Sequence, residues 1–113
     1  MRKIEENMVN AIKRGKCWTS GNTEVFTNKN GASLVYLHGN HIATVTYKKV
    51  TLFDGGWQTN TTKSRLNAIC DEFCVPGEGV FQEKFEWYVR RFIAMAAGSR
   101  VYNVEPFESG VTL

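Results

Sequence analysis

The chain has 113 residues, enough for one domain and too few for two ordinary ones, so we expect a single domain over residues 1–113. Hydrophobic residues make up 42% of the chain, which is typical of a folded globular protein and excludes a disordered one. The net charge of +3 is too small for a dedicated nucleic-acid coat protein, and no apolar run approaches the roughly 20 residues that span a bilayer.

Residues 2–14 carry the pattern of a short amphipathic helix. Acidic residues lie near the start and basic residues near the end, which is the order that the helix dipole favours, and Gly15 is a natural stop. The narrow apolar stripe predicts that this helix lies on a sheet. The stripe consists of Ile4, Met8, Ala11 and Ile12.

The middle of the chain, from Cys17 to Thr59, has the pattern of short strands. Tight-turn sequences such as Gly39-Asn40 and Lys48-Lys49 separate its apolar runs, and Gly and Asn tolerate the positive φ that hairpin turns require. Short strands joined by tight turns indicate an antiparallel meander of about four strands. The predicted strands are 23–27, 33–37, 42–47 and 50–53.

A second helix is predicted to start after the segment 59–62, whose hydroxyl and amide side chains can cap a helix N-terminus. Pro76-Gly77 and Gly79 end this helix. Between them, apolar residues recur at the spacing of one buried stripe. These residues are Leu66, Ile69, Cys70 and Phe73.

Residues 80–97 fit two patterns. Large apolar residues recur at helical spacing, but Phe85, Trp87 and Val89 also alternate with their neighbours as in a strand. The alanine-rich end favours a helix, so we predict helix from Tyr88 to Ala97, with a hairpin as the alternative. The expected fold is therefore α+β: an N-terminal helix, an antiparallel meander, a second helix and a C-terminal helix or hairpin. Residues 111–113 can add an edge strand.

The segment from Gly56 to Ala68, GWQTNTTKSRLNA, is the most distinctive in the chain. Together with the segments 37–40 and 42–43, it resembles a family of small uncharacterised proteins of tailed bacteriophages, with no established activity. The resemblance covers most of the chain and is weakest over residues 92–102. It implies a small protein made inside an infected bacterium, and many such proteins bind host machinery or blunt host defences. Three cysteines, an odd number, agree with a reduced setting in the host cytoplasm.

The start of the second helix is the first candidate site. Lys63 and Arg65 lie in the first turn, where the helix dipole disfavours cations, and Thr61 and Thr62 add hydroxyl groups. Because up to four backbone N–H groups point outward at a helix start, the grouping resembles an anion site. In the alternative interpretation, a threonine caps the helix while the two cations extend into water or pair with acidic residues.

Aromatic residues in or beside the strands are a second candidate site. Lys48, Lys49 and Lys16 lie near them in the sequence, and rings flanked by lysines on a sheet face can stack single-stranded bases. The alternative is that these rings fill the core, because a small domain needs them there. The rings concerned are Trp18, Phe26, Tyr36, Tyr47, Phe53 and Trp57.

Metal binding and catalysis find little support in the sequence. His38 and His41 flank the Gly39-Asn40 turn, and Cys70 and Cys74 are four residues apart on the second helix. A zinc site would need the hairpin tip to meet that helix, and these spacings are not those of ordinary zinc modules. No P-loop, dinucleotide-binding fingerprint or nucleophile motif is present. We therefore expect no metal, no cofactor and no enzymatic activity.

Residues 81–93 contain more large apolar groups than one buried face can absorb. They either form the centre of the core or contribute a surface for a partner or a second copy of the chain, rich in Trp and Arg. The favoured function is non-catalytic binding to a bacterial host protein of defence or nucleic-acid metabolism, without a membrane partner. Its predicted contacts are Lys63, Arg65, Trp87, Arg90 and Arg91. The alternative is direct nucleic-acid binding, with phosphate contacts at Lys48, Lys49, Lys63 and Arg65.

Overall fold

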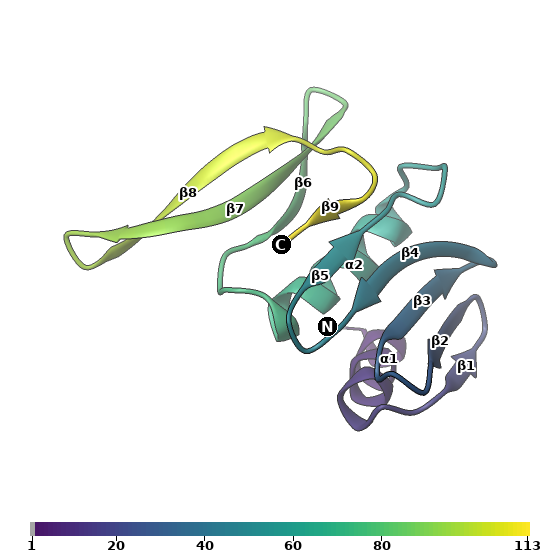
Figure 1. The fold of residues 1–113 in the computed structure, drawn as a ribbon. Coiled ribbons are helices and arrows are strands. Elements are labelled where there is room, and N and C mark those ends of the chain that lie inside the picture. Colours follow the sequence, from purple (N-terminus) through teal and green to yellow (C-terminus); the bar gives the residue numbers. More distant parts are fainter. Residues whose placement is uncertain (1) are drawn as a thin grey trace.

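The computed structural model describes residues 2–113 and shows, within them, two helices and nine strands (Figure 1). Six strands form one sheet in the order β1-β2-β3-β4-β5-β9, and three form a second sheet in the order β6-β7-β8. All neighbouring strands are antiparallel. The predicted α+β fold class is confirmed.

Helix α1 (Lys3–Arg14) forms as the apolar spacing predicts. Its buried face includes Met8, Val9 and Ile12, and it packs against β2 and against the second helix. The helix ends at Gly15, which has a left-handed conformation with φ of 64° and donates its N–H to carbonyls of the last turn. Because glycine lacks a Cβ, this conformation carries no steric penalty there.

The six-stranded sheet contains the predicted meander. Strands β2 (Thr23–Thr27) and β3 (Ser33–Leu37) have the predicted bounds, and β9 (Val111–Thr112) is the predicted edge strand. The β3–β4 turn lies one residue earlier than expected, at His38 and Gly39, which both have positive φ. The remaining strands are β1 (Trp18–Ser20), which the sequence analysis missed, β4 (Asn40–Val45) and β5 (Val50–Leu52).

Helix α2 (Asn60–Phe73) lies with α1 on one face of this sheet (Figure 1). Thr59 caps it as predicted, since its side chain accepts a hydrogen bond from the Thr62 N–H. The predicted stripe is buried at Leu66, Ile69 and Cys70, which pack into a core shared with both sheets. Neither helix in residues 2–113 is long and apolar enough to span a membrane.

The second sheet consists of β6 (Gly79–Glu83), β7 (Glu86–Ala96) and β8 (Ser99–Pro106). The prediction of a helix from Tyr88 to Ala97 is wrong, and the hairpin alternative is confirmed. Trp87 and Val89 alternate into the core, while Ala97 and Gly98 turn the chain with positive φ. Strand pairing along the whole of β7 therefore outweighs the helix propensity of its alanines.

The joint between the second sheet and the rest of the molecule is apolar. The indole of Trp87 meets the Phe107 ring edge-on, with ring centroids 5.4 Å apart, and the Phe107 N–H donates to the Trp87 carbonyl. Val80 and Val89 are buried in the same core cluster. Beyond this joint, the β7–β8 hairpin extends away from the helices (Figure 1).

Candidate functional site

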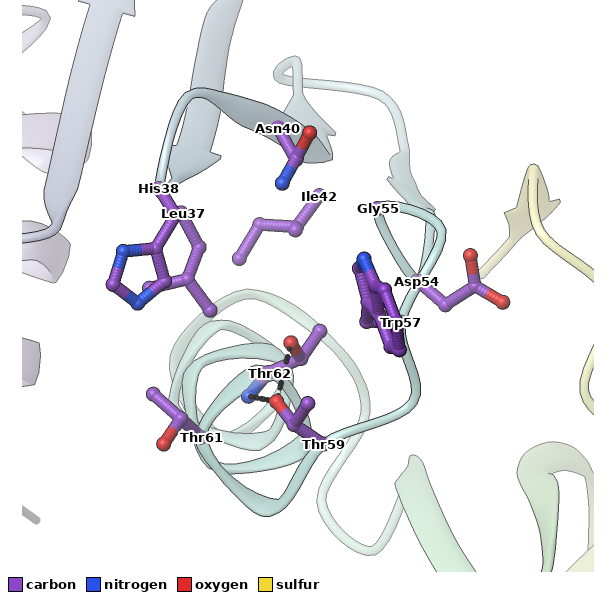
Figure 2. A pocket seen from close by; sticks show the side chains of 10 residues that line it. All are labelled: Leu37, His38, Asn40, Ile42, Asp54, Gly55, Trp57, Thr59, Thr61 and Thr62. Atoms are coloured by element: carbon purple, nitrogen blue, oxygen red, sulfur yellow. Dashed lines mark hydrogen bonds between the residues drawn. The ribbon is translucent and has the colours of Figure 1, made fainter.

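A cleft of about 350 Å³ opens at the N-terminal end of α2. Figure 2 shows His38 on one side, Trp57 on the other, and the first turn of α2 below them. The walls therefore come from the β3–β4 turn, the loop after β5 and the start of α2. The lining residues are Leu37, His38, Asn40, Ile42, Asp54, Gly55, Trp57, Thr59, Thr61 and Thr62.

The loop after β5 holds Trp57 at the cleft. The Asp54 carboxylate accepts hydrogen bonds from the Gly56 N–H at 2.9 Å and from the Gln58 amide at 3.4 Å. Gly55 has a φ of 70°, and a Cβ there would lie 3.2 Å from side-chain atoms of its neighbours across the cleft. A glycine is therefore needed for this close approach. The loop leaves the Trp57 side chain 73% exposed.

The hydroxyl groups at the helix start are largely committed to the helix itself. The Thr59 Oγ1 atom accepts from the Thr62 N–H at 3.1 Å, and the two hydroxyls lie 2.9 Å apart. Thr62 is buried, which corrects its predicted role in contacting an anion. Thr61 lines the cleft at the first turn of α2, on the same side as His38 (Figure 2).

Arg65 is buried, so its predicted role as a surface contact is corrected. Its Nη1 atom lies 2.7 Å from a carboxylate oxygen of Glu5, and its Nε donates to the Thr23 hydroxyl at 3.1 Å. The Ser64 hydroxyl donates to the same Glu5 oxygen at 2.6 Å. Arg65 follows Thr62 by three residues and precedes Ile69 by four, so it lies on the buried stripe of α2.

The charge of Glu5 explains why this buried cation is tolerated. Burial alone raises the pKa of the Glu5 carboxyl, but hydrogen bonds from Ser64 and Arg65, together with the charge of Arg65, lower it by more. The carboxylate therefore stays ionised and pairs with Arg65 inside the protein. Glu5 lies 60 residues before Arg65, so no local sequence pattern connects the two.

Lys63 stays at the surface and is tied to the second sheet. Its Nζ atom donates to the Gln82 side-chain oxygen at 3.3 Å. Lys48 and Lys49 lie in the β4–β5 turn, where they line a hollow together with Phe73 at the other end of α2. Because α2 has 14 residues and is about 21 Å long, the predicted phosphate contacts do not form one surface.

The predicted partner contacts also separate. Trp87 is buried, so its predicted interface role is corrected: its indole belongs to the core. Arg91 is half-buried and binds the Glu105 carboxylate at 3.1 Å and the Thr112 carbonyl at 2.7 Å. Arg90 is exposed, with its guanidinium carbon 5.7 Å and 5.5 Å from the ring centroids of Phe81 and Tyr102.

The end of the β7–β8 hairpin is a surface that the sequence analysis missed. Every residue from 93 to 101 is exposed, and we call this segment the arm. It includes Ile93, Met95 and Val101, which are 55%, 59% and 37% exposed. A strand interpretation of residues 86–96, with Gly98 as the turn, would have revealed an apolar hairpin end.

Hydrogen bonds hold the base of the arm. The buried Glu78 carboxylate accepts from the Phe92 N–H at 2.8 Å and from the Val75 N–H at 3.0 Å. The first of these bonds satisfies a backbone donor where the β7–β8 register shifts between Phe92 and Ala94. The Tyr102 hydroxyl donates to the Pro76 carbonyl at 2.6 Å. The arm therefore projects from a well-bonded base.

The histidines and the helical thiols lie apart from one another. His41 packs between the rings of Tyr36 and Phe53, whereas His38 lines the cleft. The neighbouring Cys74 thiol and burial raise the pKa of the Cys70 thiol well above its usual range, so it stays protonated. Among residues 2–113, no group of three or more His, Cys, Asp or Glu side chains is arranged to hold a metal ion.

Comparison with known proteins gives one family. A family model described as "Kyanoviridae Gp96 protein" matches residues 1–113, which confirms the resemblance to a phage protein family. No curated protein and no solved structure matches the chain.

Proposed function

The chain belongs to the Kyanoviridae Gp96 family of phage proteins, and on that premise we propose that it is a non-catalytic accessory protein that binds a bacterial host protein. In this proposal it acts in the host cytoplasm and modulates a defence or nucleic-acid-processing system. The arm is the docking element, and Arg90 borders it.

The exposed apolar surface of the arm supports this function above any other observation. Nine consecutive residues are exposed, and no charge lies between Arg91 and Arg100. Val104, which is 50% exposed on β8, extends this surface toward the base. Exposed apolar groups on a hairpin mark sites of association, because their burial in a complex is favourable.

The turn at the tip of the arm gives a second argument. Ala97 has a φ of 51°, in the left-handed region that costs a non-glycine residue about 1–2 kcal/mol. Asn, Asp or Gly would relieve this strain in a two-residue hairpin turn. Alanine instead keeps the tip apolar at the expense of hairpin stability, as expected for a tip that is buried in a partner.

The charge of the hairpin indicates the chemistry of the partner. Residues 87–104 contain three arginines and no acidic residue. Arg90 lies between two rings that restrict its side chain, so little entropy is lost when its N–H groups bind a carboxylate. We therefore expect an apolar groove with acidic residues at its edge on the host protein.

Affinity capture from infected cells tests this function. The tagged protein, captured with nuclease treatment, is expected to retain a host protein, and Met95→Ser is expected to lower the yield roughly tenfold, which equals about 1.4 kcal/mol of binding. Phe26→Ser is the matched control, because Phe26 is 49% exposed on the other sheet. The proposal fails if nuclease releases every captured protein or if both variants retain the partner equally. If the tagged protein captures only its own untagged copies, the arm is a dimer contact instead.

A further inference from the structure

We propose that the end of the molecule around Tyr47 binds single-stranded nucleic acid, at a site separate from the arm. Tyr47 lies in the β4–β5 turn, and its side chain is 92% exposed. An exposed ring can stack on a nucleobase, and every base offers a flat face for this contact. The inference does not rest on the proposed binding of a host protein.

Two hollows border the Tyr47 ring. One, of about 390 Å³, is lined by Lys13, Arg14 and Gly31 among others, and the second, of about 180 Å³, is lined by Lys48 and Lys49. Both hollows also share Thr46 and Phe73 with Tyr47. A flexible strand could therefore pass from one hollow to the other across the tyrosine, with basic side chains along both parts of its course.

The topology brings four segments to this end, and three of them are basic. In an antiparallel meander, the turn after β2 and the turn after β4 lie at the same end of the sheet. The end of α1 joins them, because the Thr27 hydroxyl donates to the Lys16 carbonyl at 3.4 Å. The end of α2 joins them through Phe73, which lines both hollows. The segments are 13–16, 28–31, 46–49 and 72–78.

The net positive charge of these four segments is larger than that of the whole chain. They contain six basic and two acidic residues, a net charge of +4, whereas the complete chain carries +3. Glu72 is paired with Lys13 at 2.7 Å, and the buried Glu78 accepts two backbone hydrogen bonds. The positive charge is supplied by Lys13, Arg14, Lys16, Lys29, Lys48 and Lys49.

Hydrogen bonds fix the backbone of the turn that presents the tyrosine. The Thr46 N–H donates to the Lys49 carbonyl at 2.9 Å, and the Thr46 hydroxyl accepts from the N–H groups of Lys48 and Lys49 at 3.3 and 3.2 Å. The Lys48 Nζ atom lies 5.4 Å from the centre of the Tyr47 ring. One ring and a neighbouring cation thus stand ready to contact a base and its phosphate. Duplexes keep their bases stacked, so this arrangement favours single strands.

The lysines at this end also have a structural alternative. Lys13 and Arg14 lie in the last turn of α1, where cations stabilise the helix dipole. In that interpretation, charge reversal would lower stability and would leave no nucleic-acid affinity to change. Binding measurements therefore separate the two interpretations.

The test is fluorescence anisotropy with labelled dT and rU oligonucleotides of about 15 nucleotides, and a duplex of equal length, at about 50 to 200 mM salt. We expect both single strands to bind more tightly than the duplex. With about three to four phosphate contacts, the logarithm of affinity should fall with the logarithm of salt at a slope of about −2 to −3. A difference between dT and rU would identify which nucleic acid is preferred.

Variants locate the site. Tyr47→Ala should lower affinity roughly fivefold or more, while Tyr47→Phe retains it, because stacking uses the ring. The pair Lys48→Glu, Lys49→Glu should lower affinity at least roughly tenfold. The matched control is Lys3→Glu, Lys84→Glu, two exposed lysines outside the four segments, which should change affinity by less than about threefold. Circular dichroism melts confirm that each variant is folded.

Three results would overturn the proposal: no binding at low salt, a duplex that binds as tightly as the single strands, or equal losses in the two charge-reversal pairs. Met95→Ser should leave oligonucleotide affinity unchanged. Loss of host-protein capture in that variant, with intact nucleic-acid binding, would show that the two surfaces work independently.

Discussion

The six-stranded region and the arm differ in how far their apolar side chains are buried. In the first region, two helices cover one sheet face, and residues such as Met8 and Val35 are fully buried. In the arm, two strands extend without cover, and Met95 is 59% exposed. The difference teaches that the apolar side chains of the six-stranded region are buried within the protein, whereas those of the arm can be buried only by another molecule.

Two arginines differ in burial in the same way as the two regions. Arg65 is enclosed in the core, with its donors bound to Glu5, Thr23 and, at 3.4 Å, Asn22. Arg90 lies on the surface of the second sheet between two rings, with no ion pair among the described residues. The same residue type thus holds two elements together in one region and remains available for a partner in the other.

The largest expected effect comes from exchanging these arginines for methionine. Arg65→Met should destabilise the protein by about 3–5 kcal/mol, because Glu5 is left as an unpaired buried charge. Arg90→Met should cost less than about 1 kcal/mol, the scale of an exposed cation–π contact. Urea unfolding followed by circular dichroism measures both.

A double variant serves as the control for the arginine comparison. Adding Glu5→Gln to Arg65→Met removes the unpaired carboxylate charge and should restore a large part of the lost stability. Equal unfolding midpoints for Arg65→Met and Arg90→Met would contradict the contrast between a structural and an available arginine.

Acid should weaken the six-stranded region through Glu5. The folded state lowers the pKa of this carboxyl below its ordinary value of 4.5, so its contribution to stability is fully present above that value. The contribution is lost as the pH falls through the lowered pKa, because protonation removes the partner of Arg65. Unfolding midpoints measured from neutral to acidic pH should therefore fall less steeply in Glu5→Gln than in the wild type. Parallel pH profiles would exclude this role.

The smallest expected effect lies at the tip of the arm. Ala97→Asn should relieve the left-handed strain and stabilise the hairpin by about 1 kcal/mol, which slows amide exchange in β7 and β8 roughly fivefold. Amides of β3, which belong to the other sheet, are the internal reference. Faster exchange in β7 of Ala97→Asn would show that Ala97 does not strain the turn, and the strain would then not support burial of the tip in a partner.

Local patterns predicted most of the first region. The spacing of Ile4, Met8 and Ile12 predicts α1, the threonines at 59–62 predict the start of α2, and alternation predicts β2 and β3 with their bounds. Each of these signals depends on neighbours within a few residues. The same reasoning gave a wrong prediction for the segment 88–97. Its alanines favour a helix, and only pairing with β6 and β8 makes it a strand.

The sequence by itself determined the α+β composition, the caps and turns, and the phage family to which the chain belongs. Only the tertiary structure decided which charged and aromatic groups are available. The sequence made Arg65 and Trp87 candidates for contact with a partner. In the structure both are buried, because Arg65 pairs with Glu5 and Trp87 packs on Phe107, which are distant in the chain. Exposure depends on contacts across the whole fold, so a local pattern can name a residue's chemistry without revealing whether a ligand can reach it.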